Sequence, residues 1–192
     1  MPAASVCPTV VAMSLRRRMP TAALALLAAV ALAGCSTPEP SPTATTVTRA
    51  PLFASDAEAL AAATKAYAAY LKVSDEISHD GGRNPERIKP YATGNALDLA
   101  LKSAQQFRDA DAHAIGETKL SDVALQRSSD DSAVVYACED VSGVDIIGRD
   151  GTSLVPSDRR TRYSVQISVA LATGGRPVVD DDLAVDVEGI CK

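Results

Sequence analysis

The apolar residues of this chain change their spacing once, and that change constrains the fold more than any other feature. Between Asp56 and about residue 114 they recur every three or four positions, as on one face of a helix. From Glu117 onward they alternate with polar residues, as on one face of a strand. Helices followed by neighbouring strands favour an α+β domain, with the helices on one face of a curved antiparallel sheet.

The helical part is predicted to contain three helices, at residues 56–78, 84–89 and 93–114. Ser55 or Asp56 can cap the first helix, whose apolar stripe must pack against a partner. The glycines at 81 and 82 separate the first two helices, and Pro90 ends the second.

The second part is predicted to contain four strands, at residues 123–125, 133–141, 161–171 and from 178 or 183 to 187. The third strand is the clearest, because one face carries five consecutive alternating residues, Tyr163, Val165, Ile167, Val169 and Leu171. The start of the fourth strand is less well defined, since Pro177 cannot donate to a ladder and belongs at an edge or at a first residue.

The segment before residue 36 has the pattern of a targeting signal. Arg16, Arg17 and Arg18 precede an apolar run from residue 21 to 33, which is too short to span a bilayer permanently. Ala33 and Gly34 directly before Cys35 resemble the lipobox of bacterial lipoproteins, and this resemblance implies a lipidated Cys35 as the first mature residue. The alternative is an ordinary secretory signal or an uncleaved anchor. Translation could begin at either Met1 or Met13.

The expected organisation is therefore a signal peptide at 1–34, a lipidated cysteine with a proline- and threonine-rich linker at 35–55, and a folded domain at 56–192. The full chain has 19 basic and 24 acidic residues. Without the three arginines of the signal it would carry a net charge of −8, which argues against binding to nucleic acid or to anionic lipid. The membrane partner is then the lipid anchor alone, on the extracytoplasmic face of the cell membrane.

The cysteines fit an exported protein. Cys7 falls in the signal segment and Cys35 is assigned to the lipid, so Cys138 and Cys191 remain as an even pair outside the cytoplasm. We predict a disulfide between them. The bridge requires that Cys138, with Val134 and Tyr136, lies on the same side of the sheet as Cys191.

Several segments resemble actinobacterial lipoproteins of the nuclear transport factor 2-like superfamily: 91–94, 134–143, 150–151, 174–175 and 189–191. The resemblance covers about residues 56–192 and implies a cone-shaped domain of three helices on a four-stranded sheet. It implies little about function, because this fold hosts isomerases, dehydratases, carriers and assembly modules. Such proteins often carry a tryptophan in the last strand, but this chain has none.

We expect the cone to be lined by aliphatic and tyrosyl side chains, namely Tyr67, Tyr70, Tyr163, Val165 and Ile167. Such a lining favours an apolar ligand, or close packing with no ligand at all. Asp75, His79 and His113 are the candidate bases of an enzyme, and we expect them to lie outside the cone at helix ends. No catalytic residue, metal site or cofactor is predicted, since two histidines and two paired cysteines make no zinc set. The run Asp180-Asp181-Asp182 is interpreted as solvated charges that protect a sheet edge.

Two functions remain open from the sequence. The favoured one is a tethered, non-catalytic module that binds a small apolar ligand in the cone, or meets a protein partner or a second copy of itself as a homodimer. The alternative is an extracytoplasmic isomerase- or dehydratase-like enzyme. The difference lies in the cone interior, because an enzyme needs a buried carboxylate or histidine within hydrogen-bond reach of a second polar group, and an open mouth.

Overall fold

The computed structural model describes residues 53–191. The predicted signal (1–34), Cys35 and the linker up to residue 52 lie outside this range. The described elements follow in the order α1 (Asp56–His79), η1 (Pro85–Ile88), α2 (Gly94–Ala110), β1 (His113–Ile115), β2 (Lys119–Ser128), β3 (Ser132–Asp140), β4 (Asp145–Ile147), β5 (Arg162–Leu171) and β6 (Pro177–Val185). The α+β class is confirmed. Within the described range no helix is long and apolar enough to cross a membrane.

The second of the three predicted helices, at residues 84–89, is not an α-helix. The segment between the glycine pair and Pro90 forms only η1, one turn of 3-10 helix, because four residues are too few to build an α-helix. The third helix also ends earlier than expected, at Ala110, where Asp111 takes a left-handed conformation with φ 47°. The residues after it form β1, which pairs antiparallel with β4 in a small second sheet that the sequence did not predict.

Side-chain hydrogen bonds fix the start of α1. The Ser55 hydroxyl accepts a hydrogen bond from the backbone N–H of Glu58 at 3.2 Å, and the Glu58 carboxylate accepts one from the Ala54 N–H at 2.8 Å. The stripe that α1 buries carries Ala59, Ala63, Tyr67, Tyr70, Val73 and Ile77 at intervals of three and four residues. These small and aromatic residues set α1 directly against the sheet.

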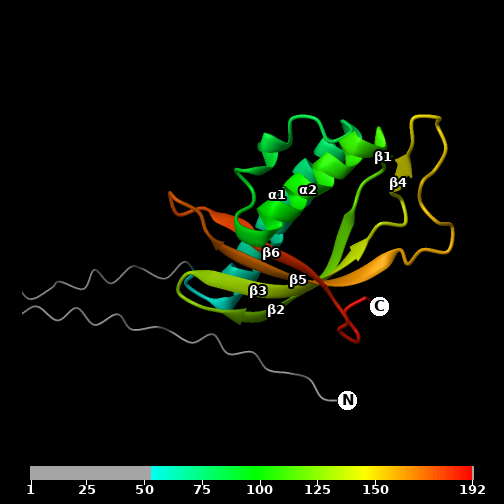
Figure 1. Ribbon diagram of the computed structural model, residues 1–192. Helices are drawn as coiled ribbons and strands as arrows, with labels where there is room; N and C mark the ends of the chain where they lie inside the picture. The colour runs from blue at the N-terminus through cyan, green and yellow to red at the C-terminus, as the bar shows by residue number, and fades with distance from the viewer. Residues whose placement is uncertain (1–52, 192) are drawn as a thin grey trace, which may run out of the picture. The chain divides into compact units, whose positions relative to one another are not determined.

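The main sheet has four antiparallel strands in the order β2-β3-β5-β6, and both helices lie on the same face of it (Figure 1). The strand register brings apolar residues together on the inner face of the sheet. Val135 of β3 lies opposite Ile167 of β5, and Ala137 lies opposite Val165. All four are buried. Pro177 is the first residue of β6, the edge strand, as the missing N–H of proline requires.

A bulge in β6 decides which of its aspartates faces the helices. Val169 pairs with Val179 but Ser168 pairs with Asp181, so Asp180 is an extra residue in the ladder. This extra residue moves each later side chain of β6 to the opposite face of the sheet. Asp182, which pairs with Ile167, therefore points to the inner face. In a regular strand Asp181 would take that place.

The other two aspartates hold the start of α2. Asp180 accepts a hydrogen bond from the Thr93 hydroxyl at 3.0 Å, and Asp181 accepts one from the Asn95 amide at 2.7 Å. Negative charge is favourable at a helix N-terminus. The interpretation of residues 180–182 as a solvated charge run was therefore wrong, since all three carboxylates accept hydrogen bonds from residues in a helix or at its N-cap.

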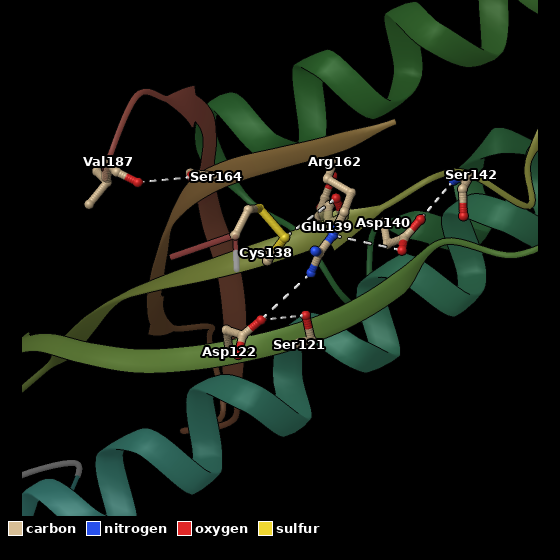
Figure 2. The surroundings of a disulfide bond; sticks show 10 residues. Ser121, Asp122, Cys138, Glu139, Asp140, Ser142, Arg162, Ser164 and Val187 are labelled. Atoms are coloured by element: carbon tan, nitrogen blue, oxygen red, sulfur yellow. Dashed lines mark hydrogen bonds and ion pairs between the residues drawn. A yellow bond between two sulfur atoms is a disulfide. The ribbon is translucent and has the colours of Figure 1, made fainter. Parts of the chain in front are cut away.

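The predicted disulfide is present. Cys138 and Cys191 are bonded, with their α-carbons 5.0 Å apart. Cys138 and Val185 both pair with Ser164, so the two cysteines approach from the same outer side of the sheet. Figure 2 shows the Ser164 hydroxyl donating to the carbonyl of Val187 at 3.3 Å, which holds the C-terminal segment beside the bridge.

An arginine links the strands next to the disulfide. Arg162 of β5 lies 3.8 Å from the Asp140 carboxylate of β3 and 3.9 Å from the Asp122 carboxylate of β2 (Figure 2). Asp122 has a positive φ of 52° and falls in the irregular part of the β2 ladder. The cation thus spans three strands at the end of the sheet where the disulfide lies.

Candidate functional site

A hydroxyl and two carboxyl groups meet between α1 and the sheet. The Tyr67 hydroxyl of α1 donates to Oε1 of Glu139 on β3, and it lies 3.0 Å from Oδ2 of Asp182 on β6. Tyr67 is 1% exposed, while both acids are partly buried. A phenol carries one proton and so satisfies one acceptor at a time. The second contact is best satisfied when one of the two carboxyl groups is itself protonated.

The acidities of the three groups agree with this arrangement. Burial raises the pKa of Glu139 to about 7 and that of Asp182 to about 6, against the opposing effect of the Tyr67 hydrogen bonds. Burial and then the two neighbouring acids raise the pKa of Tyr67 far above its usual value, so this phenol stays protonated. Glu139 and Asp182, called the acid pair below, therefore exchange protons near neutral pH.

The acid pair should make the protein less stable as pH rises. Because both folded pKa values are above those of the unfolded chain, the folded state binds more protons between about pH 4 and about pH 7. The free energy of unfolding should therefore fall across this window and level off above it. Glu139→Gln, which keeps an acceptor for Tyr67, should reduce the slope in urea titrations from pH 5 to 8. The exposed Glu188→Gln is the control, and equal slopes in the two variants would contradict the assignment.

A crevice of about 200 Å³ lies between α1 and α2, next to the acid pair. Its walls are formed by Tyr70, Ser74, Ile77, Ser78, Leu99, Ala100, Ser103, Ala104 and Phe107. Tyr70 connects it with the acid pair, because its ring stacks on that of Tyr67 with centroids 5.8 Å apart. Burial, followed by the charge of Asp182, raises the pKa of Tyr70.

One hydroxyl on the crevice wall is poorly satisfied. The buried Oγ of Ser74 makes no hydrogen bond of normal length and angle with the described residues. It still lies near enough to the Tyr70 phenol to oppose the rise of that pKa. Ser78, one turn further along, differs because its hydroxyl donates to the Asp75 carbonyl at 2.9 Å. Ser74 and Tyr70 thus form a polar pair at the crevice, whose mainly apolar wall also carries Ser78 and Ser103.

The five residues expected to line the cone occupy different environments. Tyr67, Val165 and Ile167 belong to the packed core, and Tyr70 lies between this core and the crevice. Tyr163 lies apart, with its exposed hydroxyl donating to the Arg160 carbonyl at 2.5 Å. At four of these five positions the interior is therefore closely packed, which is one of the two expected alternatives.

The three candidate bases are outside the acid pair. Asp75 accepts hydrogen bonds from the Thr118 N–H at 3.0 Å and the Thr118 hydroxyl at 3.1 Å, and desolvation raises its pKa. His79 Nε2 lies 2.6 Å from the Gly116 carbonyl, and His113 is exposed on β1. Both histidines line one surface cavity of about 380 Å³. The described residues contain no group of three or more side chains that could hold a metal ion.

The sequence interpretation missed both members of the acid pair. The signal for Glu139 was present, since it continues the parity of Val135 and Ala137 on β3 and therefore points inward. Asp182 gave no such signal, because the bulge at Asp180 changes the parity of β6. The expectation of a lining free of carboxylates was therefore wrong.

Comparison with known proteins shows no family for this chain. No family model matches the chain, and no curated protein matches it. Among solved structures, the intermembrane space region of the chloroplast protein ARC6 aligns with a TM-score of 0.48 and 12% identity, covering 65% of this chain and 95% of that one. The protein Aln2 from a Streptomyces species aligns with a TM-score of 0.41 and 13% identity, covering 65% and 87% respectively.

Proposed function

We propose that this protein is a lipid-anchored extracytoplasmic lipoprotein with a nuclear transport factor 2-like domain that binds a small ligand without transforming it. The observation that carries the proposal is the crevice between α1 and α2, where the poorly satisfied Ser74 hydroxyl lies on a mainly apolar wall. The ligand is accordingly a small apolar molecule with one hydrogen-bonding group. The crevice volume of about 200 Å³ limits it to about one ring, since an engineered apolar cavity of about 150 Å³ binds benzene.

p-Cresol and toluene form a matched pair of probes, because they differ by one hydroxyl. Ligand-observed NMR on residues 36–192 should show tighter binding of p-cresol. Ser74→Ala should reduce that preference by roughly threefold to tenfold, the usual net contribution of one hydrogen bond. Ser78→Ala is the control, because its hydroxyl lines the same crevice but is already bonded to the Asp75 carbonyl. Equal effects of the two serine variants would contradict the assigned polar contact.

Filling the crevice tests the location of the site. Ser103→Phe places a ring in the crevice, whereas Gln106→Phe places the same ring on an exposed position of the same helix outside it. Binding of p-cresol should weaken by at least roughly tenfold in the first variant, equivalent to about 1.4 kcal/mol, and stay unchanged in the second. Equal binding by both would place the ligand elsewhere.

A second candidate is an isomerase- or dehydratase-like enzyme, and the acid pair is the observation that favours it. A carboxyl group with a pKa of about 7 can act as a general acid or base near neutral pH. Against this role, Tyr67 already bonds to both carboxyl groups, and neither Glu139 nor Asp182 lines the crevice. The binding module is therefore the better supported of the two functions.

Lipidation is tested independently of the ligand. Cys35→Ser should prevent incorporation of labelled fatty acid and leave an uncleaved or soluble chain, because acyl chains hold such a protein at the membrane by about 0.8 kcal/mol per buried methylene. Detergent phase partitioning and metabolic labelling measure this directly. Equal partitioning of the native chain and the variant would exclude Cys35 as the anchor.

A further inference from the structure

A second hollow, which shares no lining residue with the crevice, lies along an earlier stretch of α1. Its volume is about 430 Å³, which falls in the usual range of about 300 to 1,000 Å³ for ligand pockets. One wall is formed by Ala62, Lys65, Ala66 and Ala69 of α1, and the other by Pro90, Tyr91, Arg176 and Pro177. We call these eight residues the α1 groove. It joins three segments far apart in the sequence: the middle of α1, the turn after η1 and the start of β6.

The α1 groove has an apolar floor and a cationic rim. Alanines, prolines and the ring of Tyr91 supply the floor, and its charged members, Lys65 and Arg176, are both basic. Within residues 53–191 neither cation forms an ion pair. Arg176 is instead held at the rim by donating from Nη2 to the Pro90 carbonyl. The two cations therefore give the groove a positive rim in a chain with 24 acidic and 19 basic residues.

From this combination of charge and surface we infer that the α1 groove binds a free single-chain amphiphile with an anionic head, such as a medium-chain carboxylate. The carboxylate lies between Lys65 and Arg176, and the hydrocarbon chain covers the alanine and proline floor. Charge-assisted hydrogen bonds to a carboxylate are the strongest contacts that this rim can make. A bilayer surface is a poorer match, since two cations in a concave site on an acidic domain give little attraction to a charged plane.

Photocrosslinking tests this site on the full-length protein. Decanoate and decanol that carry the same diazirine near the chain end are irradiated with the purified full-length protein, and the labelled peptides are identified by mass spectrometry. The decanoate probe should label peptides that contain residues 62–69, 90–91 or 176–177 at least roughly tenfold more than the decanol probe, because a charged group adds a strong contact. Equal labelling by the two probes would overturn the inference.

Charge variants distinguish binding that depends on the two rim cations from binding that depends only on the hydrocarbon chain of the probe. The double variant Lys65→Gln and Arg176→Gln should lose most of the preference for decanoate, whereas Lys102→Gln and Arg127→Gln, two exposed cations outside the groove, should keep it. Ala66→Glu places an anion on the floor and should abolish labelling, with the intact Cys138–Cys191 bridge as the check on folding. Undiminished decanoate labelling in the first double variant, or labelling of peptides outside the groove, would refute the site.

Discussion

Replacing Cys138 and Cys191 together by serine should lower the free energy of unfolding by about 4 kcal/mol. The bridge closes a loop across a sequence separation of 53 residues. In the chain-entropy model a loop of this size restricts the unfolded chain by about that amount. The effect should be large because Cys138 is fully buried and the bridge fixes the C-terminal segment on the outer face of the sheet. Urea denaturation of the oxidised protein and the double variant measures the difference.

Reduction provides the matching control. The oxidised native protein should lose about the same stability when dithiothreitol is added, and the double serine variant should be insensitive to it. A change below about 1 kcal/mol on removing the bridge would show that the C-terminal segment is held mainly by its other contacts, such as the Ser164 to Val187 hydrogen bond.

Tyr67→Phe should be the most destabilising single-atom change in the core, and its effect should depend on pH. The substitution removes the hydroxyl that serves both Glu139 and Asp182 and leaves two partly buried carboxyl groups without this donor. At pH 8, where both are ionised, the expected loss is about 3 kcal/mol, the scale for unsatisfied buried charged groups. At pH 5, where both are mostly protonated, it should fall to about 1 kcal/mol.

Tyr136→Phe is the matched control for this substitution. Its hydroxyl accepts a hydrogen bond from the Gln126 amide at 2.7 Å in an exposed place. Loss of this bond should cost less than about 1 kcal/mol at either pH. If the two tyrosine variants showed the same small and pH-independent effect, the contact between Tyr67 and the acids would be unimportant for stability.

The sequence predicted those parts of the fold that depend on regular spacing. The stripe on α1 and the alternation in β5 are long and unbroken, and both form the expected buried faces. The disulfide itself was predicted from the count of cysteines, and the shared face that it requires is present. By contrast, β1 and β4 have three residues each, too few for a periodic pattern, and they depend on each other for pairing.

The candidate site depends on irregularities that a spacing argument does not contain. The position of Asp182 follows from one extra residue at Asp180, and neighbouring acids gave no hint that one of them would turn inward. Glu139 was predictable from the parity of β3, but the sequence analysis did not single it out. Both errors have one cause, the Tyr67 hydroxyl, which makes burial of the two acids tolerable.

The most direct test is the titration of the Glu139 and Asp182 carboxyl carbons by NMR, with and without saturating p-cresol. We assign these acids to the core and the ligand to the crevice. Two carboxyl groups should therefore titrate near pH 7 and pH 6, and the ligand should leave both values unchanged. Normal values near 4 would contradict the buried acid pair. A clear shift of either value on binding would place the acids at the ligand and favour the enzyme over the binding module.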